Sequence, residues 1–101
     1  MVQPMVTVGL HYDVLPGRNA EFEERFGQVL AALADWPGHA GSRLFRDVWD
    51  KNSYLVYSEW SDREAFQKFV QSDVFAATAA WGHTVLAGRP RHRVYTEAAD
   101  H

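Results

Sequence analysis

The chain has 101 residues, of which 47 % are hydrophobic and 14 % aromatic, with a formal net charge of −3 and no cysteine. This length allows one domain with one hydrophobic core, and the apolar content excludes a largely disordered chain. The lack of cysteine excludes disulfides, thiolate metal ligands and a cysteine nucleophile, while the acidic balance predicts no general binding to nucleic acid or to an anionic membrane.

The first expected element is a strand from Met5 to Asp13, where apolar and polar residues alternate with a period of two. Pro16-Gly17 ends this strand. A helix is expected to follow from Asn19, its predicted N-cap, to near Asp35. Residues at helical spacing give this helix its inward face, and they are Phe22, Phe26, Val29, Leu30 and Leu33.

The middle of the chain predicts a hairpin followed by a second helix. Two strands, Ser42 to Val48 and Ser53 to Trp60, are joined by a turn through Asp50-Lys51-Asn52. Ser61 and Glu64 then have the S-x-x-E spacing of a capping box, so the second helix is expected to begin here.

The last third of the chain predicts one more helical segment and one more strand. The segment should run from Asp73 to about Trp81, capped by Ser72 and ended by Gly82. The strand is expected from about Arg91 to Thr96, and residues from about 97 to 101 are expected to form a frayed tail.

The resulting order of elements is that of the ferredoxin-like split βαβ arrangement, an α+β fold with a four-stranded antiparallel sheet. Residues 1–101 are expected to form this single domain. The hairpin carries large apolar groups on both faces, for example Leu44 and Val48 against Phe45 and Trp49. Helices can cover only one of these faces, and the chain has no further element for the other. We therefore expect a homodimer whose two sheets pack against each other.

Several features of the run from Trp36 to Phe75 occur together in one known family. They are a Pro-Gly before the second strand, a Trp that closes the third, Ala-Phe on the second helix, and Ser-x-x-Phe at the start of the next helical segment. With these features the chain resembles the antibiotic biosynthesis monooxygenase (ABM) family of dimeric α/β barrels. The resemblance implies that fold but no single activity, because members oxygenate polycyclic phenols without a cofactor, oxidise quinols or break down heme.

Compared residue by residue, the resemblance disfavours heme degradation. The Asn, Trp and His of the heme-degrading branch fall at Leu10, Phe69 and Ala79, so all three are absent. Trp60 matches the Trp of the polyketide-oxygenating branch. The polar partners of that Trp fall at apolar residues, which are Val56, Phe66 and Phe45.

Oxygenation without a metal or a flavin needs a base that deprotonates the substrate, a dry pocket and donors for the resulting oxyanion. His11 and His83 are the candidate catalytic bases, because histidine titrates near neutral pH. His11 faces either the dimer or the helices, and its alternative role is that of a hydrogen-bonded sheet residue. His83 follows the predicted helix end, and its alternative is a solvated loop position.

Trp60 is the first candidate for substrate binding, because the sheet and the second helix begin to diverge at its corner. The same residue is also expected to fill the core there. Tyr57 and Arg43 are candidates to donate to a substrate oxygen, with surface or cross-strand contacts as the alternative. Phe69 completes the set, although its helical spacing also suits the core.

Other kinds of site are not expected. No two of the five histidines have i, i+3 or i, i+4 spacing, so no metal site is predicted. No glycine-rich nucleotide-binding motif is present either, and no bound cofactor is expected. The run Gly88 to Arg93, "GRPRHR", gathers three arginines and a histidine. We interpret it as a solvated strand end and not as a nucleic-acid site, because no basic helix or RNA-type aromatic motif accompanies it.

The predicted function is that of a cofactor-independent monooxygenase that acts on an aromatic, polyketide-like or quinol substrate in an apolar pocket. The alternative is a non-catalytic or stress-related dimer that binds a small aromatic or apolar ligand. The chain start resembles no signal peptide, and no apolar run approaches the length needed to cross a bilayer. A cytoplasmic protein that does not bind membranes is therefore expected.

Overall fold

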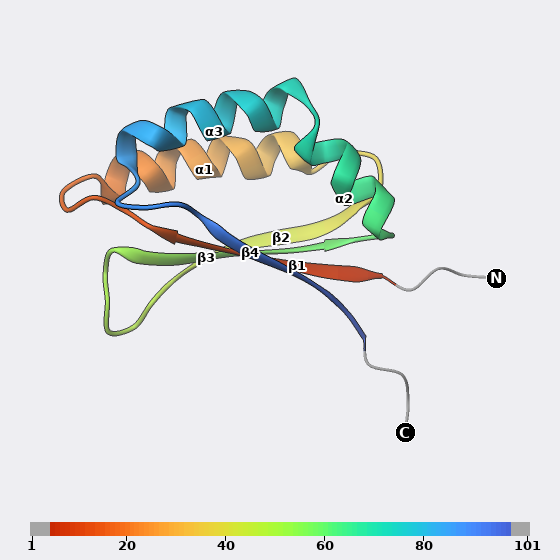
Figure 1. Ribbon diagram of the computed structural model, residues 1–101, viewed down its shortest axis with the longest axis horizontal. Helices are drawn as coiled ribbons and strands as arrows, with labels where there is room; N and C mark the ends of the chain where they lie inside the picture. Colours follow the sequence, from red (N-terminus) through yellow and green to blue (C-terminus); the bar gives the residue numbers. More distant parts are fainter. Residues whose placement is uncertain (1–4, 98–101) are drawn as a thin grey trace.

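Figure 1 shows the seven elements of the computed structural model, which describes residues 5–97. They are β1 (Val6–Asp13), α1 (Asn19–Leu33), β2 (His39–Arg46), β3 (Ser53–Trp60), α2 (Arg63–Val70), α3 (Asp73–Val85) and β4 (Arg91–Thr96). The strands form one antiparallel sheet in the order β2-β3-β1-β4. This topology confirms the predicted α+β, ferredoxin-like split βαβ fold.

All three helices lie on one face of the sheet (Figure 1). The alternation of the strands explains this arrangement, because every second side chain of a strand points to the same face. The helix-facing side chains of β1 and β3 that are almost fully buried are Val6, Val8, Tyr12, Tyr54, Val56, Ser58 and Trp60. Removing this apolar surface from water is what holds the helices against the sheet.

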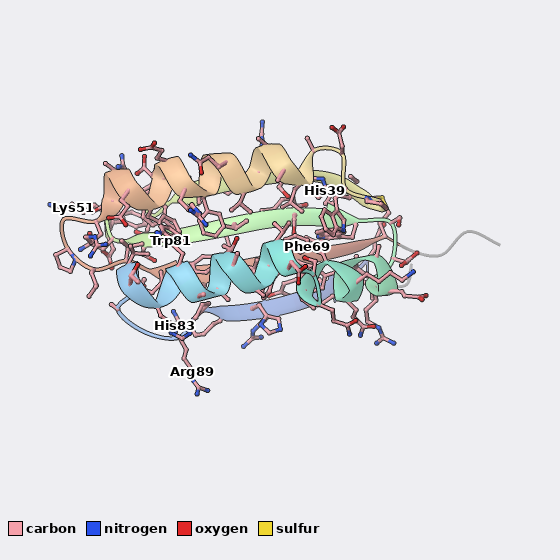
Figure 2. All side chains as sticks on the ribbon, turned by 90° about the horizontal axis from the view of Figure 1, so that it is seen from above. His39, Lys51, Phe69, Trp81, His83 and Arg89 are labelled. Atoms are coloured by element: carbon pink, nitrogen blue, oxygen red, sulfur yellow. The ribbon has the colours of Figure 1, made fainter. Side chains whose placement is uncertain are left out.

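Trp81 joins the two long helices, α1 and α3, which run side by side over the sheet (Figures 1 and 2). Its ring centre lies 6.1 Å from that of Phe22 and 6.5 Å from that of Phe26, both on α1. The guanidinium of Arg25 lies over the same indole at 5.5 Å. Each such aromatic pair contributes about 0.5–1.5 kcal/mol beyond simple burial, so Trp81 fixes the spacing of the two helices.

The N-terminus of α1 differs from the predicted cap. The helix begins at Asn19 with Arg18 in the cap position, and no side chain caps it. The Asn19 amide is engaged elsewhere, because it donates to the Lys51 carbonyl at 2.6 Å and to the Tyr54 hydroxyl at 3.1 Å. The prediction of Asn19 as the cap is therefore wrong, since a long-range contact takes the group that would have capped the helix.

Two other boundaries also differ from their predictions. The cap of α2 is Asp62 and not Ser61, because the Asp62 carboxylate accepts the N–H of Ala65 at 2.8 Å. Strand β2 begins and ends earlier than the sequence predicts. The predicted cap of α3 is confirmed, since the Ser72 hydroxyl accepts the N–H of Phe75 at 3.2 Å.

The loop between β2 and β3 is shaped by one carboxylate. Asp47 accepts the N–H groups of Trp49 and Asp50, each at 2.8 Å, which fixes the turn. Because β2 ends at Arg46, Val48 and Trp49 belong to this loop, and Trp49 is 94 % exposed. The prediction that these two side chains belong to opposite faces of a strand is therefore wrong.

The sheet face that turns away from the helices is here called the open face. Side chains of three strands line a shallow hollow of about 690 Å³ on it, and they include Thr7, His11, Leu55, Tyr57, Arg91, Arg93 and Tyr95. Leu55 is 39 % exposed, and Phe45 and Tyr95 are exposed too. The predicted second apolar face is thus present and uncovered in the single subunit.

The end of the chain completes the comparison with the predicted elements. Strand β4 has the predicted bounds, and Glu97 follows it outside any element. The rest of the expected tail, residues 98–101, lies outside the described part of the chain. Among residues 5–97, no helix is long and apolar enough to cross a bilayer.

Candidate functional site

A cleft of about 440 Å³ opens between α3 and the edge of the sheet formed by β1 and β4. We call it the α3–β4 cleft. Its larger apolar side chains are Leu10, Phe75, Leu86 and Pro90, and its polar side chains are Tyr12, Thr78, His83, Arg89 and His92. Its volume lies in the range of sites that bind small organic molecules, and so does its mixture of an apolar wall with a few polar groups.

The space beside Trp60 is filled by the protein's own side chains. A cavity of only about 20 Å³ remains there between the helices and the sheet, which is room for about one water molecule. This cavity shares Leu10, Tyr12, Phe75 and Thr78 with the α3–β4 cleft, so the two are neighbours. The opening of substrate size therefore lies at the cleft and not at the Trp60 corner.

Trp60 closes the aromatic core, and its side chain is 1 % exposed. Its ring stacks on that of Phe69 at 5.5 Å and meets those of Phe66 and His39 edge-on at 5.6 Å and 5.1 Å. The indole N–H donates to the Ser58 hydroxyl at 3.0 Å. Since the ring is enclosed and its donor is used, the core role expected for Trp60 is the one that its contacts support. Phe69 is buried in the same cluster.

The two candidate histidines lie at different cavities. His11 lies on the open face, where its Nε2 is 3.2 Å from the Ser53 hydroxyl and 3.5 Å from the Asp13 carboxylate. Of the two orientations that the sequence left open, His11 thus has the one away from the helices. His83 lines the α3–β4 cleft.

Tyr57 and Arg43 share the open face with His11. They lie opposite each other on β3 and β2. The Tyr57 hydroxyl donates to the Glu59 carboxylate at 2.5 Å, and this hydrogen bond raises the pKa of Tyr57 above its ordinary value. Neither side chain reaches the α3–β4 cleft, so the predicted residues divide between the open face, the core and the cleft.

His83 reaches the cleft because α3 does not end at Gly82, contrary to the prediction. The helix continues to Val85, and Gly82 is buried where an added Cβ would lie 3.4 Å from the Leu86 side chain. Glycine costs about 1 kcal/mol in a helix relative to alanine, but here it lets Leu86 pack closely. His83 therefore stands on the last turn of α3, at the side of the helix where Arg89 also lies (Figure 2).

Tyr12 is a cleft residue that the sequence did not indicate. It belongs to the alternating apolar residues of β1 and was therefore expected only in the core. Its ring packs against those of Phe22 and Phe26 at 5.6 Å and 5.1 Å. Burial raises the pKa of the Tyr12 hydroxyl well above its ordinary value. The group therefore stays protonated at neutral pH and keeps its capacity to donate a hydrogen bond.

His92 and Arg89 are two further cleft residues within the run that the sequence analysis interpreted as a solvated strand end. On β4, Arg91 and Arg93 line the hollow of the open face, whereas His92 pairs with Leu10 and lines the cleft as well as that hollow. The period of two along "RHR" was the signal that separates them. Arg89 lies on the loop that leads into β4, and no period indicates its direction.

The described part of the chain offers limited means of holding a metal. No group of three or more His, Asp or Glu side chains within residues 5–97 could bind a metal ion. An imidazole can also ligate heme iron by itself, and His83 and His92 each bring one to the cleft.

His39 beside Trp60 makes stability depend on pH. Burial lowers the pKa of His39 from its ordinary value of 6.5, against a smaller opposing effect of backbone hydrogen bonds. Protonation therefore favours the unfolded state. We expect this contribution to be complete above the unfolded value of 6.5 and to be lost as the pH falls toward the folded-state pKa. Urea unfolding at about pH 7.5 and 5.5 measures the loss.

The control for this prediction uses two histidine variants. In His39→Gln the glutamine can still bond Ser42, whose hydroxyl lies 2.6 Å from the His39 ring nitrogen, but it cannot titrate. The free energy of unfolding of His39→Gln should therefore depend less on pH than that of the wild type. His92→Gln changes an exposed residue of β4 and should keep the pH dependence of the wild type. Equal pH dependence in wild type and His39→Gln would contradict the assignment.

The chain matches one family model and is similar to solved structures of the same fold. A family model described as antibiotic biosynthesis monooxygenase matches residues 5–81. The crystal structure of SnoaB from Streptomyces nogalater, described as a cofactor-independent oxygenase, superposes with a TM-score of 0.84 and 26 % sequence identity, with 97 % of each chain covered.

The matched curated relatives include proteins that are named for heme. The mycobilin-producing heme oxygenase of Mycobacterium tuberculosis is 35 % identical over 71 residues, which cover 70 % of this chain and 66 % of that protein. A protein of Natronomonas pharaonis, named as a candidate heme-binding protein, is 41 % identical over 86 residues, or 85 % of this chain. The matched part is only 14 % of the length of that relative.

Proposed function

The chain belongs to the antibiotic biosynthesis monooxygenase family, and from this premise we propose that it is a cofactor-independent monooxygenase of an aromatic, polyketide-like or quinol substrate. One observation carries the proposal, namely the α3–β4 cleft of about 440 Å³ with His83, His92 and Tyr12 beside an apolar wall. The likeness to a cofactor-independent oxygenase over nearly the whole chain supports it.

The proposed reaction needs only the substrate, dioxygen and a base. The base removes a proton from an activated CH₂ group beside a phenolic ring, and the carbanion is delocalised onto the ring oxygen. It passes one electron to O₂, and the substrate radical and superoxide combine to a peroxide. Loss of water then leaves a carbonyl group, so that one oxygen atom enters the product and the other leaves as water.

We assign the base to His83 and the oxyanion donor to Tyr12. An imidazole is suited to take a proton near neutral pH. A tyrosine that burial keeps protonated can donate to the oxyanion without itself being deprotonated. Leu10, Phe75 and Leu86 supply the apolar surface on which the aromatic body would lie and from which it would displace water.

Oxygen uptake tests the function directly. The purified, metal-stripped protein is supplied with a panel of anthrones, naphthols and quinols, and the rate is compared with the uncatalysed rate. We expect catalysed uptake with a member of this panel and, for an anthrone, whose CH₂ group becomes the carbonyl, one O₂ consumed per carbonyl formed. Uptake at the uncatalysed rate across the whole panel would contradict the enzyme and favour the binding protein described next.

The alternative is a non-catalytic dimer that binds a small aromatic or apolar ligand. The observation in its favour is that aromatic side chains leave only about 20 Å³ between helices and sheet beside Trp60. On this reading the cleft retains a ligand without turning it over. Mass spectrometry of the freshly purified protein would then find a bound small molecule, which a turnover enzyme would have released as product.

Heme is a second ligand to test, because several relatives are named for it and His83 offers an imidazole in the cleft. Heme bound through His83 predicts a shifted Soret band on titration, lost in His83→Ala and retained in His11→Ala, whose side chain is on the open face. An unshifted band in the wild-type protein would exclude this ligand.

The proposed partner of the chain is a second copy, packed sheet to sheet over the open face. Leu55 lies in the middle of that face and pairs with His11 and Phe45 on the neighbouring strands. Leu55→Glu would bring a carboxylate into the interface and bury it against apolar surface, which strongly disfavours association. We expect light scattering to give the mass of two chains for the wild type and of one chain for Leu55→Glu.

The control for the dimer is Gln28→Glu, which adds the same charge on the exposed surface of α1. It should leave the mass at two chains. A wild-type protein with the mass of one chain at micromolar concentration, or a Leu55→Glu variant that remains dimeric, would refute the arrangement.

A further inference from the structure

The α3–β4 cleft has one permanently charged side chain within residues 5–97, the guanidinium of Arg89, beside the imidazoles of His83 and His92. No aspartate or glutamate of this part of the chain lines it. Leu10 and Phe75 line it from the strand β1 and from the N-terminal part of α3. A ligand that matches this lining has an apolar body and an anionic group, because complementary charge at a site selects the partner.

Arg89 is the arginine that lines the α3–β4 cleft, and unlike Arg18, Arg46 and Arg91 it has no carboxylate partner within residues 5–97. Arg91 lies 3.5 Å from Asp13, and Arg18 lies 2.8 Å from Glu21. Within residues 5–97 no ion pair of Arg89 is formed. Its guanidinium is therefore available to an anion that comes from outside the chain.

The loop that carries Arg89 is held at both ends. Before it, the N–H of Ala87 donates to the Asp13 carbonyl at 2.8 Å. After it, Pro90 restricts the backbone, and Arg91 pairs with His11 at the start of β4. Figure 2 shows Arg89 beyond His83 at the same edge of the molecule, with its side chain extending outward. The backbone at the mouth of the cleft is thus fixed, while the side chain is free to turn onto a ligand.

We propose that the ligand of the cleft is an aromatic carboxylate whose carboxylate is bound by Arg89 at the mouth. The planar guanidinium forms two parallel hydrogen bonds with a carboxylate, which gives orientation as well as affinity. The aromatic body then extends inward along the apolar wall toward His83 and Tyr12. This inference rests on the proposed function for what happens to the substrate, but the binding step does not require turnover.

Equilibrium binding of a hydroxynaphthoate and of its methyl ester tests the proposal. The ester keeps the aromatic body and removes the charge. We expect the wild-type protein to bind the acid about 10- to 100-fold more tightly than the ester, which is the effect of a charge-assisted hydrogen bond pair. In Arg89→Gln this ratio should fall to about one while the affinity for the ester is unchanged.

The matched control is Arg93→Gln, which removes an arginine of the same run from the open face. It should keep the full preference for the acid. A wild-type ratio near one, no binding of either compound, or a preference that survives in Arg89→Gln would overturn the proposal. The proposed function is tested separately. A protein that prefers the acid but does not catalyse oxygen uptake would support the proposed ligand and contradict the proposed monooxygenase activity.

Discussion

Replacing His83 with alanine is expected to slow catalysed oxygen uptake by about 10²- to 10⁴-fold, the range that a positioned general base contributes. The loss should appear in kcat, because His83 acts on the proton and not on the aromatic body of the substrate.

The controls for this prediction separate chemistry from folding. His83 is exposed on the last turn of α3, so its replacement should change the free energy of unfolding by no more than about 0.5 kcal/mol. His11→Ala, on the open face, should retain its rate. A His83→Ala variant within threefold of wild type, beside a strongly impaired His92→Ala, would move the base to β4.

Replacing Trp60 with alanine should lower the free energy of unfolding by about 3–5 kcal/mol, as is usual when a buried large aromatic side chain is truncated. The surroundings cannot collapse readily, because Phe66 and Phe69 on α2 and Ser58 on β3 are held by their own elements. The stability of a domain of this size is about 5–15 kcal/mol, so the variant should be close to unfolding. Urea denaturation followed by circular dichroism measures the change.

The chain contains a matched control for the Trp60 variant. Trp49 is 94 % exposed on the β2–β3 loop, so Trp49→Ala should change stability by no more than about 0.5 kcal/mol. A Trp60→Ala variant as stable as Trp49→Ala would contradict the core role. The milder Trp60→Phe addresses the ligand role: if it binds a naphthol as tightly as wild type does, Trp60 contributes nothing to the cleft.

The order of helices and strands could be predicted because each is indicated by the local spacing of its apolar residues. Alternation along β1 and helical spacing along α1 specify which surface each element buries, and a split βαβ sheet follows from their sequence. The helix termini were less predictable, because capping groups compete with distant partners. Asn19 donates to Lys51 and Tyr54 and does not cap α1, and no local pattern announces that choice.

The cleft depends on the path of the chain after α3, which the sequence predicted poorly. Glycine is common at helix ends, but Gly82 lies inside α3, where it packs closely against Leu86. Among the predicted site residues, His83 alone lines the cleft. Tyr12 counted as apolar and His92 as one member of a basic run, since a residue type by itself does not tell which cavity its side chain meets.

Strand β4 contributes His92 to the lining of the cleft, and this has a consequence for hydrogen exchange. All six of its residues are exposed, and within the sheet it pairs with β1 alone. An edge strand of this kind opens at a lower free energy than the core does, so its amides should exchange among the fastest of the sheet. Opening it also removes His92 from the cleft. A ligand present at 100 times its dissociation constant should therefore slow exchange along Arg91–Thr96 by about 100-fold, so this short strand would report occupancy of the cleft without any turnover.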